Sequence, residues 1–348
     1  TEFGYRQNPI WLSDKGDDVN ELILVSMFKW DQMPLGRRHE MDLTVGVYAV
    51  HRWQRETDSD IWIVDGYLSA RFMGIFLEAE GYNIRGGSKA ISPKGDLLDD
   101  YDCDVASLLD DSWEHADDSS CKAANIFGYA LRAGFDHDMF KVTWENGMAT
   151  GDPDLLDPVY TGRQLHPDHN VGLLLYKHVL PKLTMEAWAN DATYQPLWAQ
   201  GGVYNSVYIF PRVIFKPIDL FDIRFGVLGA WADRAGGHTT LPLLDDESAN
   251  SKITLGDTDD DGQMDSWRDK GLVTEDRALG VELDAAVHLH FLDEHIDIAM
   301  EFGYLKASRR LQQALIASYN PDELNADPAI AQRLSNMYTL QLRAAFIW

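Results

Sequence analysis

Acidic side chains recur at alternate positions of one segment, residues 257–265. Carboxylates stand at positions 1, 3, 5 and 9 of a loop pattern, with glycine at position 6, where a calcium-binding loop turns sharply. The expected oxygen ligands are Asp257, Asp259, Asp261, the backbone carbonyl of Gln263, and Asp265. Position 12 is Arg268 and not the bidentate glutamate of an EF-hand. We therefore predict a repeat-type Ca²⁺ loop without EF-hand helices. The alternative is a solvated acidic loop without a metal.

Other polar motifs carry weaker signals. Residues 166–169 place two histidines and an aspartate close together, as in half of a transition-metal site, although such residues more often begin a strand. Asp152, Asp154 and Asp157 are weaker calcium candidates. The sequence contains no nucleophile elbow, phosphate loop or dinucleotide fingerprint. We expect no catalytic residues and no enzymatic activity.

A long hairpin, residues 279–304, carries the most charge on one face. Every odd position from Leu279 to Phe291 is apolar, and the second arm, Ile296–Tyr304, alternates in the same way after a tight turn. Successive strand residues point to opposite faces, so one face is apolar and the other is charged. Both arms are longer than a typical strand of a soluble protein, which has roughly five or six residues. Their length suits a tilted membrane-spanning strand of about 9–11 residues. The alternative is a long hairpin in a soluble β-sandwich.

The polar face of these strands predicts a set of residues that line a lumen. They are Glu282, Asp284, His288, His290, Glu301, Arg132, Arg212 and Arg224, and Arg343 of the last strand is expected to face the same way. One hypothesis is a constriction that selects ions or sugars. The other, which we prefer, is the hydrated polar interior that any barrel needs.

The same alternation recurs along the chain and predicts an all-β fold. Thirteen strands and a stub at Phe3–Arg6 suggest about fourteen in all, and the least regular of them are Val171–Lys177 and Leu183–Ala189. Short turns alternate with long loops, of which the longest are 86–124, 147–168, 234–276 and 309–335. Outer-membrane barrels place short turns in the periplasm and long loops outside the cell. We predict one domain, residues 1–348, that forms a transmembrane antiparallel up-and-down β-barrel.

Composition agrees with a barrel and excludes other classes. The formal net charge of −26 argues against nucleic acid as a partner. The sequence has no run of 18 apolar residues, as a transmembrane helix would need. Eleven Trp and fourteen Tyr residues suit aromatic belts at two membrane interfaces. The chain begins at Thr1 without a signal peptide, so we expect a processed chain or a fragment.

Two stretches resemble a known family. Residues 48–87 contain Tyr48-Ala-Val-His-Arg-Trp-Gln, Ile61-Trp-Ile-Val-Asp-Gly-Tyr-Leu and Phe76-Leu-Glu-Ala-Glu-Gly, and residues 147–175 contain Gly147-Met-Ala-Thr-Gly-Asp and His166-Pro-Asp-His-Asn-Val-Gly-Leu-Leu-Leu. They resemble a family of large outer-membrane β-barrel proteins of myxobacteria and relatives, distantly like alginate-export-type porins. The resemblance implies a porin-like barrel in the outer membrane, with further strands upstream of this sequence. It brings no catalytic residues.

The two cysteines, Cys103 and Cys121, lie in one polar loop. A loop outside the cytoplasm lies in an oxidising environment, so we predict a disulfide between them. Such a disulfide would contribute on the order of 3 kcal/mol to the free energy of unfolding. The alternative is two free thiols.

We expect a porin-like channel for ions or small polar solutes in the outer membrane of a Gram-negative bacterium, with calcium as its cofactor. The alternative is a structural or interaction barrel that displays calcium-stabilised acidic loops to partners. Expected partners are membrane lipid and lipopolysaccharide, small polar solutes, and other outer-membrane or extracellular proteins.

Overall fold

A computed structural model gives the structure of the chain. It describes residues 19–34, 40–55, 58–88, 122–152, 159–166, 168–183, 201–234, 277–291, 295–317 and 334–346. The predicted calcium loop, the two cysteines and the Phe3–Arg6 stub lie outside these ranges, so those predictions remain predictions.

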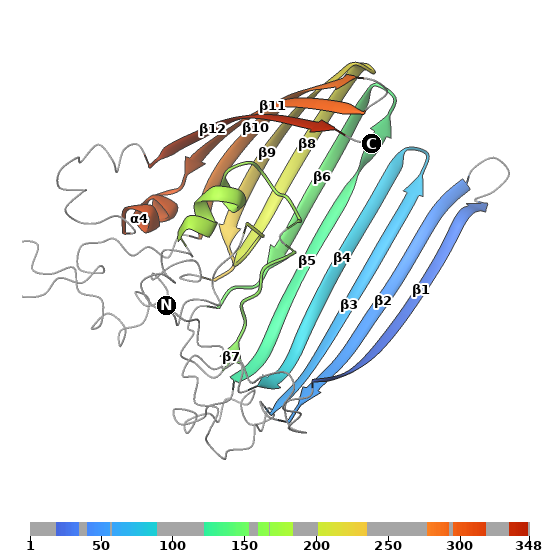
Figure 1. Cartoon of the computed structure of the whole chain (residues 1–348), viewed down its shortest axis with the longest axis vertical. Coiled ribbons are helices and arrows are strands. Elements are labelled where there is room, and N and C mark those ends of the chain that lie inside the picture. The colour runs from blue at the N-terminus through green and yellow to red at the C-terminus, as the bar shows by residue number, and fades with distance from the viewer. Residues whose placement is uncertain are drawn as a thin grey trace, which may run out of the picture.

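One antiparallel sheet dominates the described part of the chain (Figure 1). Its strands are β1 (Asn20–Pro34), β2 (Glu40–Gln54), β3 (Ser59–Phe72), β4 (Ile75–Ser88), β5 (Lys122–His137), β6 (Phe140–Ala149), β7 (Val159–Tyr160), β8 (Ser206–Ile218), β9 (Phe221–Ala232), β10 (Ala278–Phe291), β11 (Ile296–Ala307) and β12 (Asn336–Phe346). The helical elements are η3 (Leu175–Val179) and α4 (Arg309–Ala317). Within the described ranges, none of the helices has the length and apolar character needed to cross a membrane.

The long strands follow one another in sequence order across the sheet. Each pairs antiparallel with the next, and only the short β7 lies off this path, in parallel with β5. Among the described residues, β1 and β12 have one neighbour each, so the sheet has two edges. The all-β, up-and-down antiparallel prediction is confirmed. A closed barrel of about fourteen strands is not confirmed, because the described sheet has twelve strands, including β7, and is open.

Connections segregate by length to the two ends of the strands. The hairpins β3–β4, β5–β6 and β8–β9 close through two residues each, and all lie at one end. At Met73-Gly74 both residues have positive φ, 49° and 81°, as a tight hairpin turn requires. The opposite end carries the long connections 89–121, 150–205, 233–277 and 308–335. The predicted segregation of short turns and long loops therefore holds except for the β2–β3 connection, residues 55–58, which is short although it lies at the end with the long connections.

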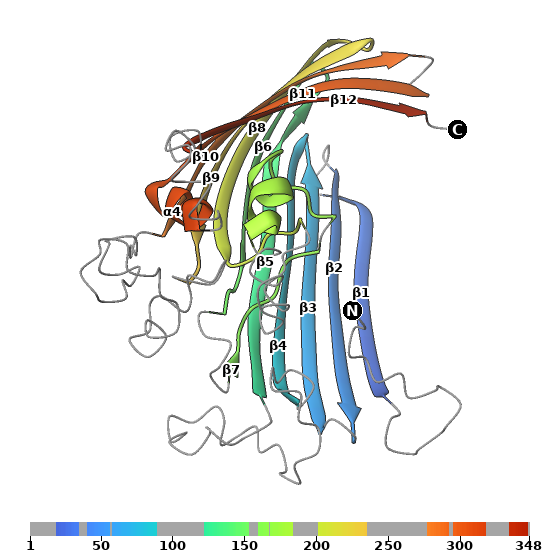
Figure 2. The same cartoon turned by 60° about the vertical axis from the view of Figure 1, so that its left-hand side comes forward.

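From Val281 onward, the alternation read from the sequence matches the two faces of the sheet, whereas Leu279 is buried in the inner core, next to a register shift between Ala278 and Gly280. On β10, Val281, Leu283 and Val287 are exposed, whereas Glu282 and His288 are buried. The same parity passes through the register to β9 and β11, where Leu283 lies opposite Val227 and Tyr304. The sheet curves around the face that bears Glu282, as Figure 2 shows. We call this the inner face and the opposite one the outer face.

The predicted strand Val171–Lys177 is wrong, because this stretch is helical and includes η3. Leu183 of the predicted strand Leu183–Ala189 is also helical, and the remainder lies outside the described residues. Short apolar runs do not distinguish a buried strand from a buried helix. Residues 147–149 of the predicted loop 147–168 belong to β6, and the rest of that loop and the predicted loop 190–203 belong to one longer connection, 150–205, between β6 and β8.

Candidate functional site

A helical segment from the connection between β6 and β8 lies against the inner face. We call residues 168–183 the inserted segment; Figures 1 and 2 show its coils on the concave side of the sheet. Its buried apolar residues are Val171, Leu174, Leu175, Tyr176, Val179, Leu180 and Leu183. They form one core with inner side chains of the strands, including Tyr208, Phe210, Leu228, Ala230, Leu279 and Leu305. The apolar side chains of this segment are therefore buried against the sheet.

Glu282 fixes the start of the helical stretch. Its carboxylate accepts hydrogen bonds from the backbone N–H groups of Leu173 (2.5 Å), Leu174 (2.7 Å) and Leu175 (2.8 Å). The first N–H groups of a helix lack intrahelical partners and carry partial positive charge, so a carboxylate there satisfies them. Gly172 has φ +70°, and a Cβ at this position would lie 2.9 Å from Glu282 Oε1. Glu282 was predicted to line the lumen; it lies on the inner face but anchors the inserted segment.

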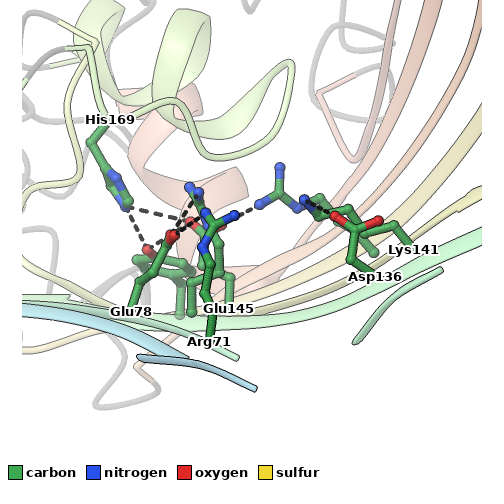
Figure 3. Close-up of polar contacts among 9 residues, drawn as sticks. Arg71, Glu78, Asp136, Lys141, Glu145 and His169 are labelled. Carbon is green, nitrogen blue, oxygen red and sulfur yellow. Dashed lines mark hydrogen bonds and ion pairs between the residues drawn. The ribbon is translucent and has the colours of Figure 1, made fainter. Parts of the chain in front are cut away.

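Ion pairs cross the inner face from β3 to β8 (Figure 3). Arg71 and Arg132 contact Glu78 at 3.1 and 3.4 Å. Arg132 also lies 3.4 Å from Glu145, which pairs with Arg212 on its other side. The Glu145 side chain is 1% exposed. Alternating charges on neighbouring strands thus form one continuous row, with its central carboxylate buried.

His169 of the inserted segment contacts the buried Glu145 carboxylate of this row. Its Nε2 lies 2.7 Å from the Tyr208 hydroxyl and 3.4 Å from Glu145 Oε1, and Tyr208 donates to the same Glu145 oxygen at 3.1 Å. Burial lowers the pKa of His169 from its ordinary value, and the nearby Glu145 carboxylate opposes that shift. His166 instead pairs with Asp168 at the exposed surface. No group of three His, Cys, Asp or Glu side chains in the described ranges could hold a metal, so the transition-metal hypothesis gains no support.

A cavity of about 430 Å³ opens between the inserted segment and the inner face. Its charged lining residues are Arg132, Lys141, Lys177, Arg212, Arg224, Arg343, Asp284 and Glu301. Two of these, Lys141 and Lys177, were not among the predicted lumen residues. Strand parity on β6 could have identified Lys141, whereas Lys177 was assigned to a strand that does not exist. The missed Glu145 follows from the same parity on β6.

Histidines and carboxylates form a second cluster near the short-turn end. His290 Nε2 lies 2.8 Å from Asp222 Oδ2. The Nδ1 atoms of His288 and His290 lie 3.4 Å and 3.6 Å from Asp297 Oδ1. Arg224 donates to both oxygens of Asp222, at 2.7 and 3.1 Å. Each of these residues thus has a charged partner close by on the inner face.

The predicted lumen residues therefore share one face but divide into different roles. Glu282 holds the inserted segment, and Asp284, Glu301, His288 and the three arginines line the cavity: Arg132, Arg212 and Arg224. His290 belongs to the neighbouring cluster.

No family model matches the chain, and no curated protein matches it. Solved structures that resemble it include the outer membrane channel DcaP of Acinetobacter baumannii, with 10% identity over 81% of this chain and a TM-score of 0.29. Another is the copper transporter OprC, with 11% identity over 82% of this chain and a TM-score of 0.28. The chain spans 56% and 38% of the lengths of these two proteins. Such remote similarity transfers no function.

Proposed function

We propose that this chain forms the wall of a bacterial outer-membrane channel that passes ions or small polar solutes. The observation that carries the proposal is the outer face, where large apolar side chains are exposed across the whole sheet. They include Val47, Trp62, Val64, Phe127, Val142, Trp144, Val213, Phe225, Leu283, Met300, Phe302, Leu340 and Leu342. Soluble proteins rarely expose an apolar patch of more than a few hundred Å², whereas a membrane barrel needs such a band toward lipid.

Aromatic residues support a membrane orientation. On the outer face, Trp53, Trp62 and Trp231 lie near the end with long connections. Trp30 and Phe291 are exposed near the short-turn end. Rings of this kind favour the two membrane–water interfaces. Membrane lipid and lipopolysaccharide would contact this outer face, with the long connections outside the cell.

Closure is part of the proposal. Edge strands in hydrocarbon would leave backbone N–H and C=O groups without partners, at several kcal/mol or so for each group. The edges of the described sheet, β1 and β12, must therefore pair in the membrane, with each other or with further strands.

The inner face supports a polar pathway. It carries the charged row from Arg71 to Arg212 and the cavity beneath the inserted segment. A lumen lined by such groups provides water and solutes with hydrogen-bonding partners across the membrane.

Single-channel recording tests the function. The chain, refolded in detergent and added to a planar lipid bilayer, should give discrete conductance steps. A folded, bilayer-inserted chain that gives no steps would contradict the channel.

The second candidate is a plugged structural barrel that displays calcium-stabilised loops to partners. It is favoured by one observation, the apolar core that the inserted segment forms with β8, β9, β10 and β11. Two results would favour this candidate over the channel. The folded protein would give no conductance, and it would bind extracellular partners only when calcium is present.

A further inference from the structure

We propose that the cavity between the inserted segment and the inner face is a binding site for small oxyanions, organic carboxylates or phosphates. This inference rests on the proposed channel and names the class of solute that it would select. The cavity volume of about 430 Å³ lies within the range of small-molecule sites, about 300–1,000 Å³.

Cationic groups dominate the accessible lining of this cavity. Six cationic side chains line it against two carboxylates, Asp284 and Glu301. In a chain of net charge −26, a local excess of cations of this kind favours binding of an anion at this cavity.

The buried carboxylates of Glu145 and Asp222 lie behind Arg132, Arg212 and Arg224, whereas Arg343 pairs with Glu301, which itself lines the cavity. Arg212 and Arg132 are 34% and 43% exposed, whereas Glu145 between them is 1% exposed. Likewise, Arg224 is 40% exposed and its partner Asp222 is 6% exposed. The buried carboxylates hold the guanidinium groups in place, and a ligand in the cavity would contact the guanidinium groups before these carboxylates.

Arginine geometry selects the ligand class. A guanidinium has five N–H donors, and Arg224 gives Nε and one Nη2 hydrogen to Asp222. Its remaining donors are available to a ligand in the cavity that it lines. The planar fork of donors matches the paired oxygens of a carboxylate or phosphate, so an oxyanion gains more here than a neutral solute of equal size.

The inserted segment contributes a cation of its own, Lys177. This side chain lines the cavity, and among the described residues it forms no ion pair. Among the described carboxylates, Asp284 also lines the cavity and interacts with Lys177 electrostatically, without a close ion pair. Lys177 is the residue of choice for a test, because its removal breaks no close ion pair among the described residues.

The matched probes are glycerol 3-phosphate and glycerol, which differ by one phosphate. Calorimetric titration of the refolded protein in detergent should show binding of glycerol 3-phosphate and none of glycerol. Lys177→Gln should weaken that binding about 3- to 10-fold, as expected for one charge-assisted contact. Lys182→Gln is the control, since Lys182 lies in the same segment but does not line the cavity, and it should bind like the wild type.

Bilayer recording separates this inference from the proposed channel. Glycerol 3-phosphate should reduce the single-channel current of the wild type at lower concentration than that of Lys177→Gln. Absence of calorimetric binding, or equal weakening by Lys177→Gln and Lys182→Gln, would overturn the oxyanion site even if the channel conducts. Phosphate-dependent binding that follows the two variants as expected, without any conductance, would support the site and reject the channel.

Discussion

Two walls of this sheet share one construction but differ in what covers them. The first wall, β1–β4, has little packed against its inner face, and β1 is exposed on both faces along almost its whole length. In the second wall, β8–β11, the inner side chains of Leu228, Glu282 and Leu305 are fully buried. The inserted segment packs mainly against this second wall and accounts for the difference, although Tyr82 of β4 also packs against the same core.

The outer faces of the two walls are alike. Val64 of the first wall is 47% exposed and Phe225 of the second is 51% exposed. The inner faces differ in residue size where the segment packs, because a Cβ on Gly303 would lie 3.1 Å from the Leu173 Cβ. The comparison shows that the alternation of apolar residues determines the exposed side chains of the outer face in both walls. On the inner face, contact with the inserted segment determines locally which side chains are buried and how large they are.

Removal of the Glu282 carboxylate should break this asymmetry most strongly. Glu282→Ala leaves three buried N–H groups of the inserted segment without their acceptor, at about 1–3 kcal/mol each. We expect faster hydrogen exchange and proteolysis of residues 171–183 and a larger single-channel conductance. The control is Glu21→Ala, at an inner position of β1 on the open wall, where Glu21 pairs with Arg52 at the exposed surface; it should change neither. Equal protection of residues 171–183 in wild type and Glu282→Ala would show that the anchor is not needed.

The outer faces offer a sharper test of what the walls share. Leu283→Arg on β10 and Val64→Arg on β3 both place a charge toward lipid, at a cost of about 2–4 kcal/mol near the midplane. Both variants should therefore refold poorly into bilayers, as measured by heat-modifiable electrophoretic mobility and urea titration. Glu80→Arg, on the inner face, should refold like the wild type. If Leu283→Arg and Val64→Arg refold as well as Glu80→Arg, the outer face does not contact lipid.

The strands could be predicted from the sequence because their apolar and polar residues alternate with a period of two. From Val281 onward β10 alternates, and Leu283 and Glu282 could be placed on opposite faces from that pattern alone, whereas the register shift beside Gly280, which leaves Leu279 buried, carries no such signal. The inserted segment escaped because its run Val171–Leu175 is continuously apolar. Its buried positions 171, 175 and 179 do recur with helical spacing, a signal that favours a helix.

Contacts between remote positions could not be predicted. The Glu282 carboxylate binds backbone groups more than one hundred residues earlier in the sequence, since Leu175 is 107 positions away. Backbone N–H groups are present at every residue but proline, so no residue type marks the one that a carboxylate will find. Strand parity placed Glu282 on the correct face but did not reveal its partner.

Acidification should loosen the covered wall alone. Burial lowers the pKa of His169, so the folded protein binds fewer protons at this site than the unfolded chain. The stabilising contribution is therefore present above the ordinary histidine pKa of about 6.5 and is lost as the pH falls below it. Between pH 8 and pH 5, protection of the inserted segment against hydrogen exchange should therefore decrease.

The variant His169→Gln is the control for this pH effect. It should remove the pH dependence of the inserted segment and leave β1–β4 as in the wild type. A pH dependence that persists in His169→Gln would assign it to other groups.

The smallest effect on either wall is expected from calcium. The predicted ligands Asp257, Asp259, Asp261 and Asp265, with the Gln263 carbonyl, concentrate negative charge in the connection between β9 and β10. Bound Ca²⁺ would offset their repulsion, and extracellular loops of this kind bind it at about 10⁻⁴–10⁻³ M.

Chelation should therefore expose residues 235–276 to proteases, while the sheet that begins again at β10 keeps its hydrogen-exchange protection. Asp259→Ala and Asp261→Ala should make cleavage independent of calcium, because each removes a carboxylate ligand from the centre of the pattern. Asp246→Ala provides a matched control, since Asp246 lies in the same connection but outside the ligand spacing. Cleavage that is unaffected by both the chelator and the ligand substitutions would contradict the calcium site and leave only a solvated acidic loop.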